Sequence, residues 1–222
     1  MDYIGSYSKY LALAAALVGT FLYPHLKGTK AKYVVWMIWY SVLTEFVGEY
    51  YYFWFNRPNT ILYNLYTLVS ITFFLWWFRG LLSSNKRKKL VKYFIGVFWV
   101  ANLINAILLN NVLYQPTNYA FVIGVIFLVI TICYFFIEMF NKEVVLNIRD
   151  SIYFWFALGV LLFYATFLPF YVTTNFFARS AESFKILGVA VFMLNVIMNC
   201  CFILGFMKAK VSADQHTLNQ RT

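Results

Sequence analysis

The feature that most constrains this chain is the segment FVIGVIFLVITICYFFI (121–137), which carries no charged side chain. Similar apolar runs recur from one end of the sequence to the other. An α-helix of roughly twenty mainly apolar residues crosses the ~30 Å hydrocarbon core of a bilayer, so these runs predict transmembrane helices. A transmembrane β-strand would alternate polar and apolar residues over about ten positions, and this segment does not.

The composition agrees with a polytopic α-helical membrane protein. Of 222 residues, 63% are hydrophobic and 12% are charged, whereas a soluble domain carries about 25% charged residues. The start, MDYIGSYSKY, has no basic stretch before its apolar run and no cleavage pattern after it, so this run is expected to remain as a helix. Cys133, Cys200 and Cys201 fall within predicted spans and are interpreted as small core residues.

The spacing of the apolar runs predicts an all-α bundle of seven transmembrane helices. They are expected at about 7–24, 33–55, 60–79, 92–113, 118–140, 151–173 and 183–207. The loops between them are short. The prediction is therefore one transmembrane domain over residues 1–207 and a polar cytoplasmic tail over residues 208–222.

The positions of the basic residues predict the orientation. Four lie on one side of the predicted bundle: Lys9, Arg57, Arg179 and Lys185. Fourteen lie on the other: Lys27, Lys30, Lys32, Arg79, Lys86, Arg87, Lys88, Lys89, Lys92, Lys142, Arg149, Lys208, Lys210 and Arg221. Because cytoplasmic loops are enriched in Lys and Arg, we expect the N-terminus outside and the C-terminus in the cytoplasm.

The same rule accounts for the formal charge of +10 without a nucleic-acid partner. The bilayer itself is the expected partner. The densest basic cluster, Lys86, Arg87, Lys88 and Lys89, is interpreted first as a topology signal. Contact with anionic lipid head groups is the alternative.

Two acids interrupt the second predicted helix, in the segment TEFVGEYYYFWFNRPN (44–59). Glu45 lies roughly 18 Å from the helix start, near the middle of the bilayer, and Glu49 lies one turn further on the same face. An ionised acid at that depth costs several kcal/mol. Glu45 is therefore expected to face the bundle interior and to meet a polar partner.

Other predicted helices carry polar side chains that are suitable partners for these acids. With Glu45 and Glu49, the candidate central site comprises Asn64, Tyr66, Asn102, Asn105, Tyr164, Asn195 and Asn199. As a functional site, it would bind a small solute, a proton or a cation, as intramembrane acids often do. As a structural feature, the same groups would be hydrogen-bond glue between helices.

No catalytic or cofactor-binding motif is found in the sequence. It contains no nucleotide-binding loop, no HExxH, no Ser-His-Asp set and no Cys/His metal pattern. The expected protein is therefore not an enzyme and uses no cofactor or metal. The leading hypothesis is a small-solute transporter or ligand sensor. The alternative is a structural or partner-binding membrane subunit.

Four short segments resemble a broad set of uncharacterised bacterial seven-transmembrane-helix proteins: SVLTEFVG (41–48), YNLYTL (63–68), FWFALGVLLFY (154–164) and NVIMN (195–199). This resemblance implies the seven-helix fold and a bacterial cytoplasmic membrane. The segment LYPHLKGTK (22–30) is similar to the Pro-Gln turn of PQ-loop and SWEET-type carriers, with His25 in place of Gln. That likeness implies a repeated three-helix layout.

Overall fold

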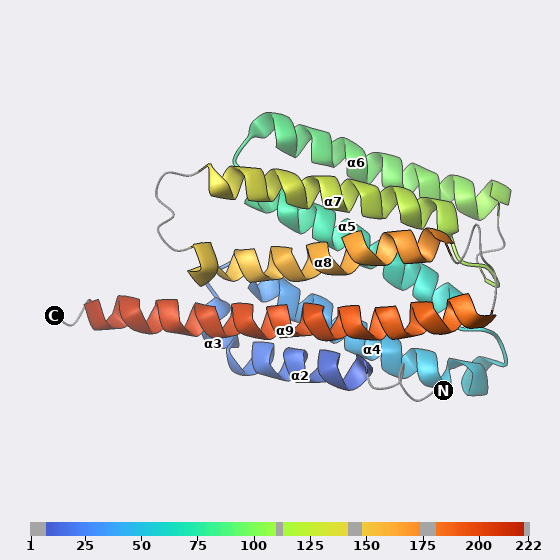
Figure 1. The fold of residues 1–222 in the computed structure, drawn as a ribbon, viewed down its shortest axis with the longest axis horizontal. Helices are drawn as coiled ribbons and strands as arrows, with labels where there is room; N and C mark the ends of the chain where they lie inside the picture. Colours follow the sequence, from blue (N-terminus) through green and yellow to red (C-terminus); the bar gives the residue numbers. More distant parts are fainter. Residues whose placement is uncertain (1–7, 110–112, 142–147, 174–180, 220–222) are drawn as a thin grey trace. The chain divides into compact units, whose positions relative to one another are not determined.

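The computed structural model describes residues 8–109, 113–141, 148–173 and 181–219, and the regular structure in these ranges is entirely helical (Figure 1). The elements are α2 (Ser8–Phe21), α3 (Tyr23–Leu26), α4 (Lys32–Phe55), α5 (Thr60–Leu81), α6 (Asn85–Ile104), the π-helical η1 (Asn105–Leu109), α7 (Asn118–Phe140), the 3-10 turn η2 (Ile148–Asp150), α8 (Ile152–Val172) and α9 (Ala181–Asn219). The predicted all-α class is confirmed. Two compact units divide the chain: Met1–Val42 with Lys142–Thr222, and Leu43–Asn141.

Five helices in the described ranges are long and apolar enough to cross a membrane. They are Thr60–Leu81, Asn85–Ile107, Asn118–Phe140, Ile152–Val172 and Lys185–Ala209. This is the architecture of a multi-pass membrane protein. The other two predicted spans correspond to α2 and α4. With 14 residues, α2 is about 21 Å long, and the 24 residues of α4 include two glutamates and several tyrosines and tryptophans that lower its hydropathy.

Two helices extend further than the sequence predicted. The helix expected from residue 92 begins at Asn85, so the basic cluster Lys86–Lys89 forms the first turns of α6. The last helix continues to Asn219 and includes much of the predicted polar tail. Lys and Arg are good helix formers, and a helix has no need to end where the apolar run ends.

In the first unit, α9 packs along α8 and α2. A Cβ added to Gly159 of α8 would lie 2.8 Å from Cys201 Cβ and 3.2 Å from the Met198 carbonyl oxygen of α9. The two backbones approach this closely because glycine has no side chain there. On the same two helices, the buried ring of Phe156 meets Phe206 edge-on, with ring centroids 5.0 Å apart. Small residues and aromatic edges therefore hold this unit together.

In the second unit, α5, α6 and α7 pack against one another. The three helices meet at Gly124 of α7, where an added Cβ would lie 2.5 Å from Phe98 Cε2 and 3.1 Å from Ile71 Cδ1. Because the three helices share this contact, it serves as a common reference point. The polar residues further along each helix can be compared by their distance from it.

Candidate functional site

The carboxylate of Glu45 lies beside α5, within the second unit. The Tyr63 hydroxyl donates a hydrogen bond to Glu45 Oε2 over 3.3 Å. The backbone of α4 comes close to this tyrosine at Gly48, where an added Cβ would lie 2.8 Å from the hydroxyl. Asn59 Nδ2 donates to the Gly48 carbonyl over 3.0 Å, which fixes the start of α5 against α4. The acid on the second predicted helix therefore has a partner on the third, as the sequence analysis expected.

A second polar group lies on the next position of α5, Asn64. Its Oδ1 accepts the Thr117 backbone N–H over 3.1 Å, and its Nδ2 donates to the Gln115 carbonyl over 3.0 Å. The buried Thr117 precedes α7 directly. Successive helix positions are about 100° apart, so Tyr63 faces α4 while Asn64 faces the start of α7. One end of α5 therefore carries both polar contacts.

Asn105, at the end of α6, belongs to the same level of the second unit. It lies seven residues from Phe98, as Asn64 lies seven from Ile71 and Thr117 seven from Gly124. Seven residues are almost two turns, or ~10 Å, and return to nearly the same helix face. Helix periodicity therefore puts Asn105 on the face of α6 that carries Phe98, two turns beyond the aromatic contact at Gly124. We call Asn64, Asn105, Gln115 and Thr117 the amide cluster.

Asn105 differs from the rest of the amide cluster because its side chain has no hydrogen-bond partner. The residue is 1% exposed, and neither Nδ2 nor Oδ1 is bonded within the part of the chain that the structure describes. It also begins the π-helical turn η1. Single π-helical turns are rare in proteins, but those that occur are often found at functional sites. A buried, unbonded amide of this kind costs about 1–3 kcal/mol.

Three of the predicted site asparagines form hydrogen bonds within their own helices instead of between helices. Asn102 Nδ2 donates to the Phe98 carbonyl of α6 over 2.9 Å. On α9, Asn195 donates to the Val191 carbonyl over 3.0 Å, and Asn199 donates to the Asn195 carbonyl over 2.8 Å. The amide nitrogens thus bond one turn back along the same helix, the pattern that short polar side chains adopt in helix interiors.

The remaining predicted site residues have different settings. Glu49 is exposed on α4, one turn beyond Glu45, and Tyr66 is half-buried on α5, one turn beyond Tyr63. Tyr164, on α8, is buried in the first unit, as is Asn199 on α9. The second unit therefore brings Glu45 and Asn64 to one end of α5, and helix periodicity puts Asn105 of α6 at the same end. A single centre lined by helices of both units stays a prediction.

Sequence reasoning missed the strongest charged contact of the second unit. Glu138 of α7 was not among the predicted site residues, yet its carboxylate accepts hydrogen bonds from the backbone N–H groups of Ser83 and Ser84 and pairs with Arg87 Nη1 at 3.1 Å. The Arg87 guanidinium also lies over the Tyr134 ring, 5.2 Å from its centroid. The available signal was the first turn of α6, which has no acid of its own to balance the helix dipole.

Within the described ranges, no group of three or more His, Cys, Asp or Glu side chains is placed to hold a metal ion. The polar groups of the candidate site are one carboxylate, one phenol and neutral amides. These groups bind protons, cations and hydrogen-bonding solutes. Comparisons with models of known protein families, with curated proteins and with solved structures give no match.

Proposed function

We propose that this protein is a non-enzymatic membrane protein that binds a small polar solute or a cation inside the bilayer, as a transporter or a sensor. The binding region comprises the Glu45–Tyr63 pair and the amide cluster. The observation that carries the proposal is the buried Asn105 amide, whose nitrogen and oxygen have no partner in the described chain. A solute bound between α5, α6 and α7 would supply that partner.

Asn105 distinguishes the binding hypothesis from the structural one. If intramembrane amides only joined helices, each buried amide would be hydrogen-bonded, because more than nine in ten buried polar groups are. Asn64 meets that expectation, with both amide atoms bonded to the segment before α7. Asn105, seven residues beyond the shared aromatic contact, does not. A bound ligand explains a buried polar side chain without a hydrogen bond better than a purely structural role does.

The Glu45–Tyr63 pair provides the charge for such a site. A half-buried carboxylate can take up a proton or pair with a cation, and the tyrosine hydroxyl stabilises whichever form is present. Intramembrane acids of this kind mark proton and ion pathways in many membrane proteins. The alternative, a structural or partner-binding subunit, is favoured by one observation, the complete bonding of Asn64.

Leucine substitutions at Asn105 and Asn64 are expected to change stability in opposite directions. Asn105→Leu removes an unbonded buried amide and should raise the free energy of unfolding by about 1–3 kcal/mol. Asn64→Leu removes the acceptor of the Thr117 N–H and should lower it by a similar amount. Equilibrium unfolding of the purified proteins in mixed dodecylmaltoside and SDS micelles measures both. If Asn105→Leu lost as much stability as Asn64→Leu, Asn105 would be structural and the proposal would lose its basis.

We further propose that α2 and α4 also cross the membrane, giving seven spans with the N-terminus outside in a bacterial cytoplasmic membrane. The excess of basic residues on one side supports this orientation. In a background with the three native cysteines replaced by serine, Lys86→Cys should react with a membrane-impermeant maleimide only after the cells are opened. Labelling of intact cells would reverse the orientation.

A further inference from the structure

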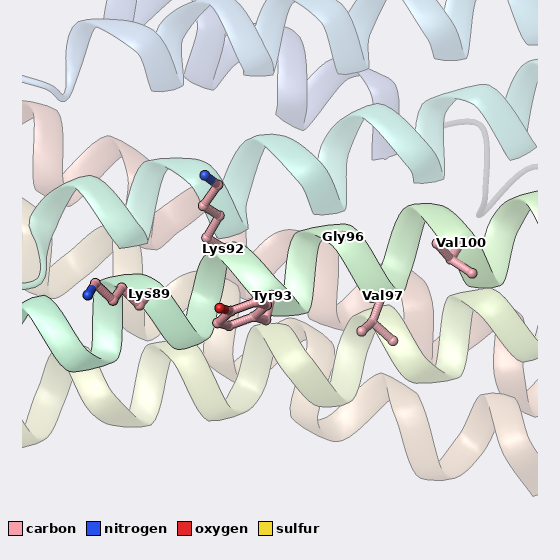
Figure 2. A pocket seen from close by; sticks show the side chains of 6 residues that line it. All are labelled: Lys89, Lys92, Tyr93, Gly96, Val97 and Val100. Atoms are coloured by element: carbon pink, nitrogen blue, oxygen red, sulfur yellow. The ribbon is translucent and has the colours of Figure 1, made fainter.

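An exposed hollow of about 640 Å³ follows one face of α6 in the second unit (Figure 2). It is lined by Lys89, Lys92, Tyr93, Gly96, Val97 and Val100. Counted from Lys89, these positions are i, i+3, i+4, i+7, i+8 and i+11, so they form a single stripe along the helix. The stripe is hollow at Gly96, where an added Cβ would have no atom within 4 Å.

The stripe changes from charged to apolar along its length. It begins with the two exposed lysines, continues through the exposed Tyr93, and ends at Val97 and Val100, which are 50% and 55% exposed. The eleven steps from Lys89 to Val100 extend ~16 Å along the helix axis. A phospholipid has the same order of chemistry over a similar length: a charged phosphate, an interfacial ester region and an acyl chain. Tyrosine is characteristic of the interfacial level.

Of the five cations at the start of α6, only Arg87 has an acidic partner in the described part of the chain. Glu138 is engaged by Arg87 and by two backbone N–H groups. In the described chain, no ion pair or hydrogen bond involves the ammonium groups of Lys86, Lys88, Lys89 and Lys92. Four cations in the first two turns are also repelled by the positive end of the helix dipole, and the first turn contains no acid. An external anion would relieve this repulsion.

We infer that this groove binds one anionic phospholipid, with its phosphate between Lys89 and Lys92 and an acyl chain over Gly96, Val97 and Val100. The site is separate from the proposed solute site. It also differs from the head-group contact expected at Lys86–Lys89, since Arg87 already pairs with Glu138 and Lys92 lies in the groove. The charge of the groove selects an anionic lipid over a zwitterionic one.

A second copy of the chain fits this face less well. Two copies inserted in the same orientation would meet about an axis normal to the membrane, with equivalent residues at equal depth. Lys89 and Lys92 of one copy would then approach the same lysines of the other. Like charges at such an interface repel each other, whereas a phosphate between the lysines is attracted.

Native mass spectrometry of the full chain, released from detergent, tests this site with phosphatidylglycerol and phosphatidylcholine as probes. The wild type should retain one phosphatidylglycerol in preference to phosphatidylcholine. Each lysine near an anionic head group contributes about a fivefold change in affinity, so Lys89→Gln with Lys92→Gln should weaken phosphatidylglycerol binding about 30-fold. The matched pair Lys86→Gln with Lys88→Gln removes the same charge outside the groove and should weaken it less than about fivefold.

Gly96→Leu fills the hollow without changing the charge, and its side chain enters open space, so the fold should be retained. It should lower phosphatidylglycerol retention severalfold, with thermal unfolding in phosphatidylcholine unchanged. Equal losses in the two lysine pairs would show general charge attraction and overturn the site. Full retention of phosphatidylglycerol by Gly96→Leu would also overturn the site. So would the finding that the chain forms a dimer, if Gly96→Leu abolished the dimer and left lipid retention unchanged.

Discussion

Replacing Glu138 by leucine is expected to lower the free energy of unfolding by about 2–4 kcal/mol. The carboxylate is 12% exposed and accepts from the N–H groups of Ser83 and Ser84 while pairing with Arg87. Hydrogen bonds to a charged group contribute about 1.5–3 kcal/mol each, and removing the acceptor leaves the donors unpaired. Leucine would leave the two backbone N–H groups and the Arg87 guanidinium without that acceptor. The turn between α5 and α6 should then loosen.

The matched control is Asp150→Asn, at the ion pair of the first unit. Lys208 Nζ lies 2.7 Å from Asp150 Oδ1, but the two side chains are 36% and 51% exposed, so solvent screens the attraction. Such pairs contribute at most about 1 kcal/mol. Equilibrium unfolding in mixed micelles should therefore rank Glu138→Leu well below Asp150→Asn in stability. Equal effects would mean that the Glu138 contacts contribute no more than a surface pair.

The helices were predictable because their signal is local. A long apolar run such as residues 121–137 needs backbone hydrogen bonds within itself when it lies in lipid, so helix follows from composition alone. The helix ends were not predictable from that signal. The charged residues Lys86–Lys89 continue the helix of α6 because helix propensity, and not hydropathy, decides where a helix begins.

The candidate site was predictable only in part. The cost of burying an acid pointed to Glu45, and its Tyr63 partner lies on the helix next in sequence. Thr117 and Gln115 were missed because their shorter hydrogen bonds with Asn64 are made by backbone atoms, which every residue carries. Asn195 and Asn199 of α9 show the converse case. They were predicted as site residues, but their amide nitrogens donate to carbonyl groups of their own helix.

Glu45 gives the second large expected effect. Glu45→Leu should lower the free energy of unfolding by about 1–3 kcal/mol, because the half-buried Tyr63 hydroxyl loses its acceptor. Glu45→Gln should remain close to the wild type, since the amide oxygen accepts the same hydrogen bond. The difference between the two variants isolates the hydrogen bond from the charge. Equal stabilities would show that the hydrogen bond from Tyr63 contributes nothing to the fold.

The charge itself is tested in proteoliposomes that enclose a pH-sensitive dye, under imposed gradients of protons, Na⁺ or K⁺. If the protein is a transporter that moves protons through Glu45, alone or in exchange for Na⁺ or K⁺, the wild type should change the internal pH, and Glu45→Gln should abolish the change although it folds. Glu49→Gln removes an equal charge from the exposed position one turn away and should leave the signal intact. A neutral amide cannot exchange a proton or balance a cation. A signal that survives Glu45→Gln would therefore exclude Glu45 as the charged group of the site and leave the amide cluster as the only basis for solute binding.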